Sequence, residues 1–110
     1  MKGIDFMEKF KVYHIAVCSK IEEDKLGLVN TGCLTNVGFY RNKNTAFSAV
    51  KENWGDIHET CYDFAIIEEV EEGLYPCSTV RWIFHWVQSE QAYVQIEEPE
   101  WLKHFCGLVI

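Results

Sequence analysis

Alternating apolar and polar positions predict several short strands in the first 40 residues. Residues 12–18 alternate, with a tyrosine and two β-branched residues on one side, as in a half-buried strand. Residues 26–29 and 34–40 are two further extended segments, broken by Asn30-Thr31-Gly32, and they fit either a hairpin or a single bulged strand. The polar residues 19–25 are expected to form the turn after the first strand.

Helical spacing replaces this alternation in the middle of the chain. Apolar residues recur every three or four positions over residues 45–54, which predicts a helix. Asn44 is the expected N-cap, and Gly55 is the expected residue after the helix end.

Strand character returns in the second half. Residues 61–70 predict a central strand, since Phe64 to Ile67 are apolar on both faces. Residues 80–87 and 92–96 predict a hairpin with its turn at 88–91. Pro99 suits a first helical position, and the following apolar stripe predicts a short helix over 99–106.

These elements predict one α+β domain over residues 1–110. The expected order is strand, strand, helix, strand, strand, strand, helix, with a mostly antiparallel sheet of four to five strands and helices on one face. A chain of 110 residues with 48% hydrophobic residues can bury a core without staples.

The charged residues are unbalanced and clustered. Lys and Arg number 10 against 17 Asp and Glu, a formal net charge of −7. A negative field repels nucleic acid and attracts basic surfaces, so the expected partner is a basic protein surface, such as a nucleic-acid-binding enzyme, and not nucleic acid itself. The candidate partner-binding residues are Glu68, Glu69, Glu71, Glu72, Glu97, Glu98 and Glu100. The alternative is that these carboxylates are solvated surface.

Aromatic residues suggest a second kind of site. Trp82, Phe84 and Trp86 share one side of a predicted strand, which favours core packing but could also stack a base. A nucleotide-binding pocket would use Tyr40, Trp82 and Trp86, with Arg81 on the phosphate.

A third candidate site lies between the end of the predicted helix and the next predicted strand. Asp56, His58 and Cys61 could form a nucleophile site, with the imidazole as base and the carboxylate orienting it. Positions i and i+3 of an extended segment point to opposite sides, so this pattern favours a structural loop. The sequence suggests no metal site and no cofactor.

The cysteines and the apolar runs bear on location. Five cysteines lie far apart without a C-x-x-C pair, which suits a reducing cytosol. No apolar stretch has the length of a signal peptide or a membrane span. The sequence predicts a protein of the bacterial or host-cell cytoplasm that does not engage a membrane.

Most of the chain after Val37 resembles a family of small open reading frames from gut bacteria, their phages and their mobile elements. The resemblance rests on Val37 to Tyr40 with Thr45 to Val50, on Asp56 to Glu59 with Tyr62 to Glu69, on Gly73 to Pro76 and on Arg81 to Phe84. It brings no activity with it. It implies a mobile-element context, in which small acidic proteins often blunt host defences.

Three functions follow, in order of preference. The first is a small acidic interaction protein that inhibits a nucleic-acid-handling or defence protein, in the manner of an anti-CRISPR protein. The second is a sponge for a nucleotide signal. The third is a small enzyme that uses the Cys61 and His58 pair.

Overall fold

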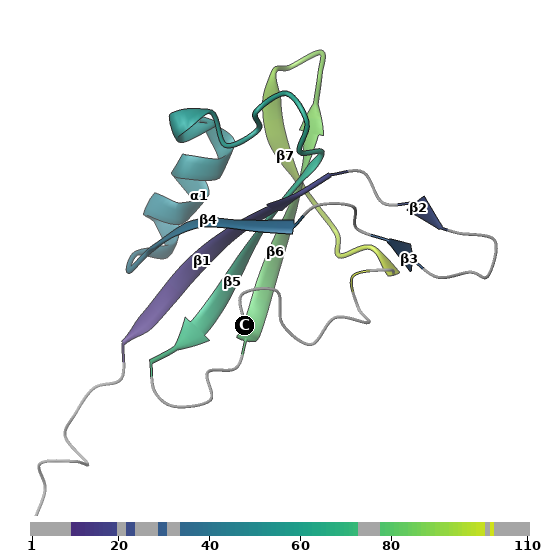
Figure 1. Cartoon of the computed structure of the whole chain (residues 1–110). Coiled ribbons are helices and arrows are strands. Elements are labelled where there is room, and N and C mark those ends of the chain that lie inside the picture. The colour runs from purple at the N-terminus through teal and green to yellow at the C-terminus, as the bar shows by residue number, and fades with distance from the viewer. Residues whose placement is uncertain are drawn as a thin grey trace, which may run out of the picture.

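The computed structural model describes residues 10–19, 22–23, 29–30, 34–72, 78–100 and 102. It has an α+β fold in which a five-stranded antiparallel sheet, ordered β4-β1-β5-β6-β7, carries one main helix and a 3-10 turn (Figure 1). The sheet strands are β1 (Lys11–Cys18), β4 (Leu34–Tyr40), β5 (Phe64–Glu71), β6 (Ser78–Val87) and β7 (Ala92–Ile96).

The first half confirms two predicted strands and corrects the segment between them. The predicted strands 12–18 and 34–40 are β1 and β4. The expected turn over 19–25 instead contains β2 (Glu22–Glu23), which pairs with β3 (Val29–Asn30) in a separate two-stranded sheet. Backbone pairing between β2 and β3 forms this strand although glutamate has a low strand propensity, because strand propensity depends strongly on context.

Helix α1 (Lys43–Lys51) is earlier and shorter than predicted. Its N-cap is Asn42 and not Asn44, since the Asn42 side chain accepts a hydrogen bond from the Thr45 N–H at 3.1 Å. The helix ends before Asn53, which adopts left-handed backbone angles, and a 3-10 turn, η1 (Trp54–Asp56), follows. The predicted helix over 45–54 had treated Trp54 as part of the apolar face.

The second half of the sheet contains the three predicted strands with shifted boundaries: β5 spans Phe64–Glu71 against the predicted 61–70, and β6 spans Ser78–Val87 against the predicted 80–87. β5 begins at Phe64 and not at residue 61, because the N–H groups of Cys61 and Tyr62 both bond the His58 carbonyl and close a turn. The predicted hairpin of β6 and β7 is present. Residues 101 and 103–106 of the predicted helix over 99–106 lie outside the described part. In the described part, the Leu102 N–H donates to the Pro99 carbonyl and closes a turn.

Both faces of the sheet are apolar near its centre. Helix α1 lies across one face (Figure 1), where Ala46, Ala49 and Val50 join side chains from four strands in the larger core. Leu102 packs on a second cluster of Cys18, Ile66 and Ile83. Strand side chains alternate between faces, so β5 supplies Ile67 to the first core and Ile66 to the second.

Candidate functional site

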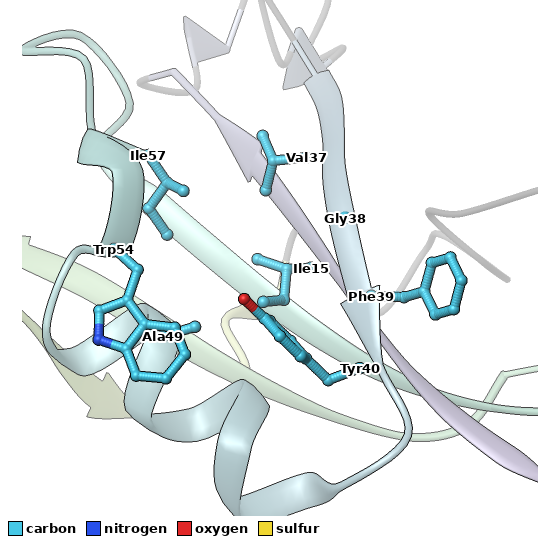
Figure 2. A pocket seen from close by; sticks show the side chains of 8 residues that line it. All are labelled: Ile15, Val37, Gly38, Phe39, Tyr40, Ala49, Trp54 and Ile57. Atoms are coloured by element: carbon cyan, nitrogen blue, oxygen red, sulfur yellow. The ribbon is translucent and has the colours of Figure 1, made fainter.

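A small apolar pocket opens where the carboxyl end of α1 and η1 meet β1 and β4 (Figure 2). Its volume is about 230 Å³, and the described residues that line it carry no charge. The lining residues are Ile15, Val37, Gly38, Phe39, Tyr40, Ala49, Trp54 and Ile57.

The pocket exists because two positions around it have little or no side chain. Gly38 pairs with Ile15 across the β1 and β4 ladder, and a Cβ built on Gly38 would meet no atom within 4 Å. Its φ of +157° is rarely adopted by other residues. On the opposite wall Ala49 is buried but short. A β-bulge beside Gly38 leaves Val37 without a β1 partner, and this extra residue lines the pocket.

Two aromatic side chains form the open part of the pocket. The rings of Tyr40 and Trp54 lie edge to face, with centroids 6.0 Å apart and planes at 82°. Trp54 is 41% exposed, which is unusual for so large an apolar side chain. Its indole N–H donates to Glu52 Oε1 at 3.2 Å, which fixes the ring orientation. Figure 2 shows Phe39 turned away from the pocket, on the other side of β4.

The segment that carries Trp54, residues 53–62, is strained and firmly anchored. Positive φ angles occur at Asn53, Gly55, Asp56, Glu59 and Thr60. Each such non-glycine residue costs of order 1–3 kcal/mol, and surrounding contacts must offset that cost. The Asn53 side chain provides two of these contacts, accepting from the His58 N–H at 3.0 Å and donating to Asp56 at 3.1 Å. Strain of this kind concentrates at functional sites.

His58 is the main anchor of the 53–62 segment. Its ring stacks on Trp86, with centroids 3.7 Å apart and planes at 9°. Its Nδ1 lies 2.9 Å from the Tyr62 carbonyl oxygen, so Nδ1 carries the proton and donates. The Tyr93 hydroxyl donates to the same oxygen at 2.7 Å, and burial raises the Tyr93 pKa.

The candidate catalytic residues therefore have structural contacts. Asp56 accepts from Asn53, His58 is buried against aromatic rings, and Cys61 is exposed at the end of the turn. Cys18 is the other cysteine in the described part, and burial raises the pKa of its thiol to about 12. Cys18 thus stays protonated and is a poor nucleophile.

The structure brings together only part of the predicted nucleotide site. Tyr40 lines the pocket, whereas Trp82 and Trp86 pack against the larger core. Arg81 is bound elsewhere: its guanidinium lies 3.4 Å from the buried Glu68 carboxylate and 3.1 Å from Glu98. Trp54 and Gly38 were not among the predicted site residues, and no local pattern in the sequence marks them.

The glutamates of the predicted acidic clusters differ in exposure and in contacts. Glu68 is fully buried, whereas its neighbour Glu69 pairs with Lys11 at 3.2 Å, a contact that raises the Lys11 pKa. Glu72 accepts from the Phe10 N–H at 3.0 Å. Glu71 and Glu98 are half-buried, and Glu97 and Glu100 are exposed. Alternation along β5 divides its carboxylates between the two faces of the sheet.

The described residues contain neither a metal-ligand cluster nor a membrane-spanning helix. No group of three or more His, Cys, Asp or Glu in that part of the chain is placed to hold a metal ion. None of its helices has the length and apolar character needed to cross a bilayer.

Comparison with protein-family models, with curated proteins and with solved structures finds no match to this chain.

Proposed function

We propose that this chain is an interaction protein that captures one apolar side chain of a partner protein in the pocket between Tyr40 and Trp54. The exposed Trp54, held over the pocket by a strained and anchored segment, is the observation that carries this proposal. Exposed, rigid aromatic residues beside a concave apolar site are typical of binding hot spots.

The size of the pocket supports a single side chain as the ligand. An apolar cavity of about 150 Å³ is enough to bind benzene, and this one measures about 230 Å³. Drug-sized ligands usually occupy about 300 Å³ or more. A phenylalanine, tryptophan or leucine side chain therefore fits better than a large cofactor.

The charge of the chain favours a basic partner. With a net charge of −7, the protein attracts basic proteins and repels nucleic acid. A basic nucleic-acid-handling or defence protein would satisfy this condition, as the inhibitor hypothesis requires. The contact residues proposed now are Tyr40 and Trp54, in place of the glutamate clusters.

The first experiment titrates side-chain analogues and follows methyl NMR signals. The probes are the N-acetyl amides of tryptophan, phenylalanine, leucine and glycine. We expect the first three to shift the signals of Ile15, Ala49 and Ile57, which line the pocket, and the glycine analogue to leave them unchanged. An Ala49→Leu variant, whose longer side chain occupies the pocket, should lose the response.

Phe39 offers a matched control for Trp54. Both are exposed aromatic residues, at 57% and 41% exposure, but the Phe39 ring points away from the pocket (Figure 2). Trp54→Ala should weaken the response and Phe39→Ala should preserve it. Shifts that are scattered over the surface, or that persist in Ala49→Leu, would overturn the proposal.

A free aromatic metabolite, including a nucleobase, is the second candidate. It is favoured by the Tyr40 hydroxyl, which Figure 2 shows turned into the pocket, where it offers a polar contact. Arg41 and Lys43 are the cations nearest to Tyr40 in sequence. Arg41 lies 4.9 Å from the centroid of the Phe10 ring, and Lys43 lies 5.0 Å from the centroid of the Trp82 ring. A rise in melting temperature with one member of a nucleotide panel would favour this candidate.

A further inference from the structure

Strand β4, which forms one wall of the pocket, is also an edge of the sheet. It pairs with β1 on one side, and no strand in the described part of the chain pairs with its other side (Figure 1). An edge strand presents backbone N–H and C=O groups that can pair with another chain.

The sequence of β4 does little to prevent such pairing. Edge strands are commonly protected by lysine, other charged residues or proline, and residues 34–40 contain none of these. Its bulge lies at Val37, which leaves Gly38 to Tyr40 as regular strand beside the pocket. Gly38 and Phe39 are exposed.

A strand added to β4 would lie next to the pocket. Paired strands lie about 4.8 Å apart and send alternate side chains to each face. A segment paired with residues 38–40 would therefore direct every second side chain toward the face that carries α1. One of these side chains would lie beside Tyr40 and Trp54 and could enter the pocket between them.

The carboxylates on and next to the segment that carries Trp54 indicate the composition of the added strand. Glu52, Asp56 and Glu59 are exposed on or next to the 53–62 segment, and Glu52 contacts Trp54 directly. Carboxylates here favour lysine or arginine in the partner, in agreement with the net charge of the chain.

We infer that the partner presents an extended, basic segment that adds as a strand to the outer edge of β4 and inserts one aromatic or aliphatic side chain between Tyr40 and Trp54. This inference rests on the proposed function, to which it adds the backbone pairing and the chemistry of the segment. Backbone pairing would supply affinity, while the pocket and the carboxylates would supply specificity.

The test uses synthetic peptides of about nine residues, a usual length for a paired strand, with phenylalanine, leucine or glycine at the centre and lysine or glutamate on both sides. Fluorescence anisotropy measures their binding to the full chain. We expect binding of the lysine peptides with phenylalanine or leucine, weaker binding as salt rises, and little binding with glycine or with glutamate flanks.

Backbone methylation separates strand addition from side-chain capture. Alternate amides of a paired peptide face β4, so N-methylating one alternate set should weaken binding about tenfold or more, while methylating the other set should have little effect. Equal effects of the two sets, in a peptide that still needs Trp54, would overturn strand addition and leave the pocket proposal intact. No binding by any peptide, with the side-chain analogues still seated in the pocket, would also overturn it.

A pair of charge variants tests the acidic residues. Glu52→Gln keeps an acceptor for the Trp54 indole, and together with Glu59→Gln it removes two charges, one in contact with Trp54 and one within the 53–62 segment. This double variant should bind the lysine peptides more weakly. Glu90→Gln, in the exposed turn between β6 and β7, is the control. Equal binding by the original chain, the double variant and Glu90→Gln would overturn the basic composition inferred for the partner segment.

Discussion

His14 is a titratable side chain held between two strands. It lies opposite Phe39 of β4, with ring centroids 5.3 Å apart, and opposite Glu68 of β5. Burial lowers the His14 pKa, and the Glu68 carboxylate opposes this effect only in part. The folded state therefore disfavours the imidazolium form.

This lowered pKa predicts a loss of stability in mild acid. As the pH falls through the ordinary histidine pKa of about 6.5, the unfolded chain takes up a proton that folded His14 still resists. The unfolded state binds more protons, so the free energy of unfolding decreases until the pH passes below the folded pKa. Urea unfolding at pH 7.5 and 5.5 should show a smaller decrease for His14→Gln than for the original chain. Equal decreases would show that other groups account for the acid sensitivity.

His58 and Trp54 have surroundings that the sequence did not indicate. His58, the candidate base for a Cys61 nucleophile, stacks on Trp86. That stack joins residues 28 positions apart in the sequence, so no local pattern could have indicated it. The place of Trp54 in the pocket wall was missed because helical spacing assigned it to a buried face, and the left-handed Asn53 ends that spacing.

Helix α1 has two alanines whose surroundings differ, although both are buried. Ala46 is fully covered in the larger core, while Ala49 also lines the pocket. The sequence pattern that predicted β1 and β4 located the strands well. It could not indicate the bulge at Val37, because a bulge depends on the pairing partner and not on the strand alone.

The alanine pair predicts opposite responses to the same enlargement. Ala46→Leu adds volume to a close-packed core and should lower the free energy of unfolding by roughly 1–3 kcal/mol. Ala49→Leu can extend into the pocket and should cost much less, or even stabilise the chain. Urea unfolding of the two variants makes the comparison. Equal losses would mean that the space beside Ala49 cannot accept a side chain.

At the scale of the whole molecule, the sheet is buried on two faces by different parts of the chain. The prediction of a mostly antiparallel sheet with helices on one face holds for α1. The opposite face has its own apolar cluster, in which Leu102 is fully buried against Cys18, Ile66 and Ile83. The continuous apolar run in β5 is the sequence feature that indicates both layers, since a strand covered on one face only would alternate.

Leu102 should therefore contribute to the stability of the whole fold and not only to its own turn. Leu102→Ala removes a fully buried side chain from the second cluster and should lower the free energy of unfolding by roughly 2–5 kcal/mol. Val80→Ala, at a residue of β6 that is 44% exposed, should cost far less and serves as the control. Equal costs in urea unfolding would contradict a closed second layer. A large cost for Leu102→Ala with a small cost for Val80→Ala would show that the second layer contributes to the stability of the whole sheet.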